Sequence, residues 1–155
     1  MFSASKKYSS AILGVYQLKR VEEFIAKRNE VAEVYNEELA KLDLVQTVKC
    51  VPSGRCSYYK FPLILDSSLD KLKFTTLLDK KYEIETGNVF YPPCHMQTVY
   101  EKLGGKCARN LSVAEEILAR TITLPMHLAM EQREAKHVAN SIQSLLQHVM
   151  RVPSF

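Results

Sequence analysis

The sequence predicts an α+β fold, in which a long N-terminal helix precedes a small antiparallel sheet with helices packed on one face. Three observations lead to this prediction. Apolar residues recur every three or four positions over residues 8–42, two strand-like segments follow over 45–65, and a second helical stripe occupies 130–150. Because 155 residues suffice for one domain with its own core, we expect a single domain over residues 1–155.

The first predicted helix runs from Tyr8 to Leu42, with one apolar stripe and no proline. At ~1.5 Å per residue it would be about 50 Å long. A domain of this size cannot cover such a helix, so we expect it to protrude or to run along a partner. Its start, Tyr8 to Tyr16, is apolar or small on nearly every side, which favours a partner at this end.

Two strands are predicted next, over residues 45–51 and 56–65, joined by a short turn at Pro52-Ser53-Gly54. Together they resemble a hairpin. Pro62 lies inside the second strand and cannot donate a backbone hydrogen bond, which favours an edge position or a bulge.

A helix should follow to about Lys81, with Ser67 as its N-cap and Asp70 completing a capping-box pattern. Residues 84–90 are expected to form a short strand. One or two helical turns are expected over 97–103, before a pair of glycines.

A second capping-box pattern, Ser112 with Glu115, precedes the next predicted helix. The segment T-I-T-L-P, ending at Pro125, predicts a short strand. The last helix is expected over about Met130–Met150.

Composition limits the classes of function. The net charge of +4 is small and evenly spread, so it does not favour nucleic-acid binding. No apolar window is long enough for a membrane span, and the N-terminus lacks the apolar stretch of a secretory signal, so we expect a cytoplasmic protein. The cysteines at positions 50, 56, 94 and 107 show no C-x-x-C spacing. We expect reduced, mostly buried thiols and no metal site.

The segment Glu85–Tyr100 is the densest candidate site. Gly87 permits unusual backbone angles, and two adjacent prolines, 92 and 93, stiffen the chain between Tyr91 and His95. A structural loop with a core tyrosine and a surface histidine would show the same pattern. The remaining histidines, 127, 137 and 148, stand alone in the sequence, and helix surface or core is the expected location for each.

Four segments, in this order, resemble the DegT/StrS class of sugar aminotransferases, which depend on pyridoxal phosphate. The segments are A-I-L-G-V-Y-Q-L-K-R with the following helix, S-Y-Y-K-F-P-L, E-T-G-N-V-F-Y-P-P-C-H, and A-E-E-I-L-A-R-T-I-T-L-P-M-H. The counterparts of the class pattern in the first segment are Ala11, Gly14, Gln17, Leu18, Arg28, Tyr35 and Leu39. The resemblance extends over about residues 3–149.

The resemblance implies the small C-terminal domain of a fold type I aminotransferase. Members of the class are more than twice this length, and their large N-terminal domain carries the Schiff-base lysine and most cofactor contacts. We therefore expect no pyridoxal phosphate on this chain alone and no catalytic residue in it. The resemblance makes Tyr91 and His95 candidate contacts for a nucleotide sugar.

Ser3 and Ser5 occupy the positions at which the class has an asparagine and an arginine that reach the cofactor phosphate of a neighbouring subunit. Serine can donate a hydrogen bond but lacks the charge and fork of arginine.

Three hypotheses follow. The chain is an aminotransferase C-terminal domain that contributes substrate-side and dimer contacts. Alternatively, it is a non-enzymatic binding or assembly module, or a half-enzyme that a separate lysine-bearing domain completes in trans. Its partner, a second copy or a separate large domain, would contact the helix Tyr8–Leu42. A zinc or thiol enzyme built on Cys94 and His95 is less favoured, because adjacent residues of an extended chain point to opposite faces.

Overall fold

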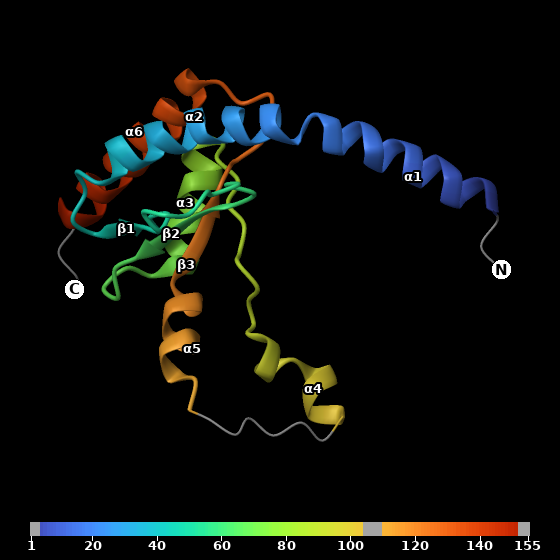
Figure 1. Cartoon of the computed structure of the whole chain (residues 1–155). Coiled ribbons are helices and arrows are strands. Elements are labelled where there is room, and N and C mark those ends of the chain that lie inside the picture. Colours follow the sequence, from blue (N-terminus) through green and yellow to red (C-terminus); the bar gives the residue numbers. More distant parts are fainter. Residues whose placement is uncertain (1–3, 104–109, 152–155) are drawn as a thin grey trace.

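A computed structural model describes residues 4–103 and 110–151 of the chain, with only the backbone described at 4–7, 101 and 149–151. Its element order is α1 (Ala4–Lys19), α2 (Val21–Leu39), β1 (Val45–Thr47), β2 (Phe61–Leu65), α3 (Lys71–Tyr82), η1 (Cys94–Met96), α4 (Thr98–Lys102), α5 (Ser112–Ala119), β3 (Thr121–Leu124) and α6 (Gln132–Arg151). The α+β class is confirmed (Figure 1).

The prediction of one continuous N-terminal helix is wrong, because Arg20 separates α1 from α2 with φ −105° and ψ 2°. The Arg20 side chain folds back on the first turn of α2, where it pairs with Glu23 at 3.2 Å and lies 4.8 Å from the Phe24 ring centroid. Neither proline nor glycine marks this break. The helix also ends at Leu39 and not at Leu42.

The expected protrusion is confirmed, because α1 extends away from the rest of the chain (Figure 1). Its large apolar side chains are exposed: Tyr8, Ile12, Leu13, Val15, Tyr16 and Leu18. The exposed fractions of Tyr8 and Leu18 reach 72% and 71%.

The three strands form an antiparallel sheet in the order β1-β2-β3. The edge position expected from Pro62 is therefore wrong, and the pairing Pro62↔Thr123 continues without a bulge. The amide of Leu65 donates to the carbonyl of Arg120, next to β3. Successive amides along a strand point to opposite sides, so the nitrogen of Pro62, three positions earlier, faces β1. There β1 has already ended, because its last pair is Thr47↔Leu63. The missing donor thus faces a position without a partner strand.

Strands β1 and β2 are adjacent but shorter than predicted, and residues 48–60 form a long connection between them. The expected turn is present, with the amide of Gly54 donating to the carbonyl of Val51 at 2.8 Å.

The expectation of reduced, buried cysteines is wrong within the described residues. Cys50 and Cys56 form a disulfide and Cys94 is exposed. Cys107 lies outside the described part.

Two predicted caps and one predicted strand are also wrong. Asp70, and not Ser67, caps α3 by accepting from the amide of Lys73 at 2.9 Å. Ser112 is the first residue of α5 and its amide donates to Asn110. Residues 84–90 form only one bridge, Gly87↔Thr123, in place of a strand. The short helix expected over 97–103, the strand before Pro125 and the last helix are confirmed.

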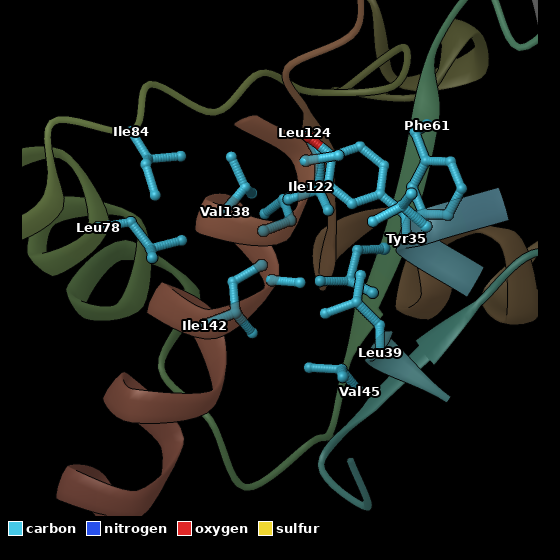
Figure 2. Packing of buried hydrophobic residues seen from close by; sticks show 14 of the residues in the cluster. Tyr35, Leu39, Val45, Phe61, Leu78, Ile84, Ile122, Leu124, Val138 and Ile142 are labelled. Carbon is cyan, nitrogen blue, oxygen red and sulfur yellow. The ribbon is translucent and has the colours of Figure 1, made fainter. Parts of the chain in front are cut away.

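The core lies between the sheet and helices α2, α3 and α6 (Figure 2). Alternate residues of β2 (Phe61, Leu63 and Leu65) point into it, which leaves Pro62 and Ile64 only partly buried on the other face. Tyr35 of α2 is fully buried and packs on Phe61, with ring centroids 4.9 Å apart. Burial raises the pKa of Tyr35.

We predict that Tyr35→Phe lowers the free energy of unfolding by about 1–3 kcal/mol, because the hydroxyl donates to the partly buried carbonyl of Pro125 at 3.0 Å and this acceptor would lose its partner. Urea denaturation followed by circular dichroism measures the change. Tyr59→Phe is the matched control, since Tyr59 is 70% exposed. Equal stability of the two variants would contradict a structural role for the Tyr35 hydroxyl.

Candidate functional site

The candidate site is an arm, residues 85–100, that leaves the sheet at Gly87 and extends to α4 (Figure 1). The backbone of Gly87 exchanges two hydrogen bonds with Thr123, of 3.0 and 2.8 Å. A Cβ on Gly87 would lie 2.6 Å from the Thr123 hydroxyl oxygen, so only glycine fits here without a shift. The arm is thus anchored to β3 near its start, at Gly87.

Tyr91 lies beside a surface hollow of about 360 Å³, between the arm and the first turns of α3. Tyr91 is 51% exposed, and the ammonium of Lys71 lies 5.0 Å from its ring centroid. Partial burial lowers the pKa of Lys71. The neighbouring Lys60 donates to the carbonyl of Asn88 at 2.9 Å. The hollow therefore combines one cation, Lys71, with threonine hydroxyls and the Tyr91 ring.

His95 lies in the 3₁₀ turn η1 and is tied to α5. Its Nε2 lies 2.8 Å from Oε1 of Glu115, and only 16% of its side chain is exposed. A second contact stiffens the arm, because the side-chain amide of Gln97 donates to the carbonyl of Pro92 at 2.7 Å. The interpretation of His95 as a plain surface histidine is thus wrong. Its partner, Glu115, was assigned to a helix cap in the sequence, and no spacing rule predicts a contact across 20 residues.

Tyr91 and His95 have different partners. Tyr91 contacts α3 through Lys71, whereas His95 contacts α5 through Glu115. No contact within the described ranges 4–103 and 110–151 joins the two side chains to each other. Ser3 lies outside the described residues, and only the backbone of Ser5 is described, in α1.

A larger cleft, of about 880 Å³, lies between the end of α3, β3 and the start of α6. His127 and His137 both line it, so these two histidines are exposed but not isolated, while His148 is exposed on α6. In the parts of the chain with described side chains, no three His, Cys, Asp or Glu residues are grouped as metal ligands. No described helix is long and apolar enough to cross a membrane.

Neither hollow fits pyridoxal phosphate by itself. The cofactor needs a lysine for its covalent bond and an acidic partner for its pyridine nitrogen. The hollow beside Tyr91 contains Lys71 but no carboxylate among its lining residues. The larger cleft contains glutamates but no lysine.

Several solved structures share this architecture. Helicobacter pylori PseC, an aminotransferase involved in the biosynthesis of pseudoaminic acid, superposes with a TM-score of 0.75 at 21% identity, over 88% of this chain and 36% of that chain. The Escherichia coli GDP-4-keto-6-deoxy-D-mannose-3-dehydratase with bound hydrated PLP gives a TM-score of 0.73 at 19% identity, over 83% and 33%. At these identities the likeness shows the fold alone.

The chain belongs to the DegT/DnrJ/EryC1/StrS aminotransferase family, whose model matches residues 7–143. Among curated relatives, a Campylobacter jejuni UDP-4-amino-4,6-dideoxy-N-acetyl-beta-L-altrosamine transaminase is 28% identical over 90% of this chain, and a Vibrio cholerae GDP-perosamine synthase is 32% identical over 86%. The chain spans 36% of the length of each. The resemblance seen in the sequence is confirmed at the level of the family.

We predict a favourable coupling of about 0.3–1 kcal/mol between His95 and Glu115, the range of partly exposed ion pairs. A double-mutant cycle of His95→Ala, Glu115→Ala and the double variant, in urea denaturation, measures it. Hydrogen exchange over 94–100 should accelerate in either single variant, because the arm loses its bond to α5. Glu116→Ala is the control, since Glu116 contacts Arg120 and not the arm. Additive single effects would contradict the tether.

We predict that Lys71 reacts with acetic anhydride faster than Lys73, an exposed lysine two positions on in α3. The lowered pKa of Lys71 leaves a larger neutral, nucleophilic fraction of its amine at a given pH. Limited acetylation at pH 8 with peptide mass spectrometry gives the two rates. Tyr91→Ala should reduce the difference by admitting water, and a wild-type chain in which Lys73 reacts faster would disprove the prediction.

Proposed function

We propose that this chain is the C-terminal domain of a pyridoxal-phosphate-dependent nucleotide-sugar aminotransferase. In this role it contributes substrate-side and inter-subunit contacts and does not catalyse transamination alone. Membership of the family supports the reaction class, and relatives named for a UDP-linked and a GDP-linked sugar support a nucleotide sugar as the substrate. The arm is the observation that supports a role in binding. It presents Tyr91 at an open hollow, and it is fixed on both sides of Tyr91, at Gly87 and at His95.

Tyr91 and His95 are the proposed substrate contacts. Tyr91 is half exposed, and its ring and hydroxyl are suited to stacking and to a hydrogen bond with a sugar or base. The Glu115 carboxylate holds His95 by Nε2, so Glu115 acts as a positioning residue. Because the side chain of His95 is mostly buried, its proposed contribution is to orient the arm and to offer a small polar edge.

The cofactor belongs to the other part of the proposed enzyme. Pyridoxal phosphate supplies an electron sink when it is bound through a lysine. The two hollows described above lack the required set of groups, so no step of the reaction is assigned to this chain. Ser3 and Ser5 are the proposed donors of neutral hydrogen bonds to the cofactor phosphate of a neighbouring subunit.

The exposed apolar side chains of α1 favour a second possibility, in which the chain works as an assembly module or as a half-enzyme completed in trans. An isolated helix with this much apolar surface is expected to gain from a covering partner. A separate lysine-bearing domain or a second copy of this chain is the proposed partner at α1 and α2.

The test is reconstitution. The chain is mixed with a lysine-bearing large domain from a relative such as the Vibrio cholerae synthase, produced as a separate polypeptide. We expect a complex by sedimentation and transamination of a nucleotide 4-keto sugar, whereas each part alone should be inactive. In the complex, His95→Ala should raise KM for the sugar by about tenfold with a smaller change in kcat, the cost of one lost polar contact. His148→Ala, on the exposed side of α6, is the control.

The outcomes separate the alternatives. A complex without activity would favour the assembly module, whereas an active complex would support the proposed C-terminal-domain role and would show that a separate domain can complete it in trans. A chain that transaminates alone, or that shows a saturable, borohydride-fixed pyridoxal label on one of its own lysines, would overturn the proposal that it lacks catalytic competence.

A further inference from the structure

A small covalent ring lies in the connection between β1 and β2. The Cys50–Cys56 disulfide closes it around the turn from Val51 to Gly54. A Cβ on Gly54 would lie 2.4 Å from Cγ2 of Val51 and 3.8 Å from Sγ of Cys50, so the glycine lets the turn fold back tightly inside the ring. Both cysteines are partly exposed, which leaves the sulfur pair open to exchange with a dithiol.

The ring is attached to the first turns of α2. The guanidinium of Arg55, inside the ring, contacts both carboxylate oxygens of Glu22. The carbonyl of Cys56 accepts from the side-chain amide of Asn29 at 3.2 Å, while the same amide donates to the carbonyl of Ile25 at 2.7 Å. The contact with Arg55 lowers the pKa of Glu22. Two separate contacts, seven positions apart on α2, therefore connect the ring to this helix.

The attached turns adjoin the break between α1 and α2. Glu22 lies two residues after Arg20, the residue at which the helix is interrupted. The direction in which α1 leaves the body depends on the first turn of α2, because α1 has few contacts with any other element (Figure 1). A contact that holds Glu22 and Asn29 consequently restricts the base of α1.

We propose that Cys50 and Cys56 form a reversible disulfide that acts as a redox-dependent clamp on the α1–α2 junction. In the oxidised state the ring holds Arg55 against Glu22 and the Cys56 carbonyl against Asn29. A dithiol reductant of the thioredoxin class opens the ring. Its thiolate attacks one sulfur, its second thiol releases the mixed disulfide, and two electrons and two protons pass to the cysteines to give two thiols. Glutathione disulfide, which takes up the same two electrons, reverses the step through thiol exchange.

In the reduced state the segment 50–56 gains conformational freedom, because the covalent closure no longer restricts it. Arg55 and the Cys56 carbonyl then occupy their α2 contacts for less of the time. The clamp concerns only how firmly α1 is directed, so it is independent of the proposed aminotransferase role.

The experiment uses the full 155-residue chain in a Cys94→Ser/Cys107→Ser background, which removes the other two thiols. The protein is equilibrated at a series of glutathione ratios. Differential alkylation with mass spectrometry gives the fraction of the Cys50–Cys56 pair that is oxidised, and hydrogen exchange is measured on the same samples. We expect exchange over residues 20–29 to be about fivefold faster in the reduced protein, the effect of losing a surface ion pair and a hydrogen bond.

Arg55→Ala is the decisive variant, because it removes the clamp on Glu22 while leaving both cysteines in place. Oxidised Arg55→Ala should exchange over 20–25 as fast as the reduced parent. Lys49→Ala is the matched control, since Lys49 is an exposed cation of the same connection and no described contact joins it to α2. Cys50→Ser/Cys56→Ser should match the reduced parent, and the reduced parent itself serves as the comparison if this variant does not fold.

Alkylation of Cys50 and Cys56 that stays the same at every glutathione ratio would overturn the reversible disulfide. If the Cys50–Cys56 disulfide forms but hydrogen exchange over residues 20–29 is the same in the oxidised and reduced protein, the clamp is overturned. Neither result bears on reconstitution with a lysine-bearing domain, so failure here and failure of the proposed function are distinguishable.

Discussion

The hydroxyl of Tyr35 is the contact on which the arrangement of the chain depends most. Its ring packs against Phe61 in the central strand, and its oxygen donates to the carbonyl of Pro125, where β3 ends and the chain turns toward α6. One buried side chain thus joins α2, the central strand and the segment that leads to α6. Since a partly buried carbonyl without a donor is costly, the hydroxyl of Tyr35 holds the end of β3 close to α2, and α6 packs beside α2 to complete the core.

Apolar residues repeating every 3.6 positions correctly predicted the helices that bury a continuous apolar stripe. The stripes of α2 and α6 were recognisable because each has apolar residues at every turn. The break at Arg20 was not, because a side chain that folds onto the next turn leaves no mark in hydrophobic spacing. The strands were overestimated for a similar reason. Strand-like residues extend over 48–51 and 56–60 on either side of the turn, but in the structure they lie in the connection between β1 and β2 and pair with no strand.

The candidate site shows the same division between local and distant information. The glycine, the prolines and the aromatic rings of the arm are local signals, and they located the segment. What fixes it in space comes from elsewhere: Thr123 of β3 at one end and Glu115 of α5 near the other. Capping rules assigned Glu115 to the start of its own helix, yet a histidine 20 residues earlier competes for the carboxylate. Family resemblance could assign a role to Tyr91 and His95 but could not indicate which side chains hold them.

The single bridge between Gly87 and Thr123 also has a consequence for association between chains. Outer strands expose unpaired amides and carbonyls, to which a strand of another molecule can add. Here the outer side of β3 is partly occupied by the backbone of Gly87, and the opposite outer strand, β1, has only three residues. The described sheet therefore offers little template for strand addition. Self-association of this chain should proceed through helical surface, α1 above all, and should give limited oligomers in preference to β-rich fibres.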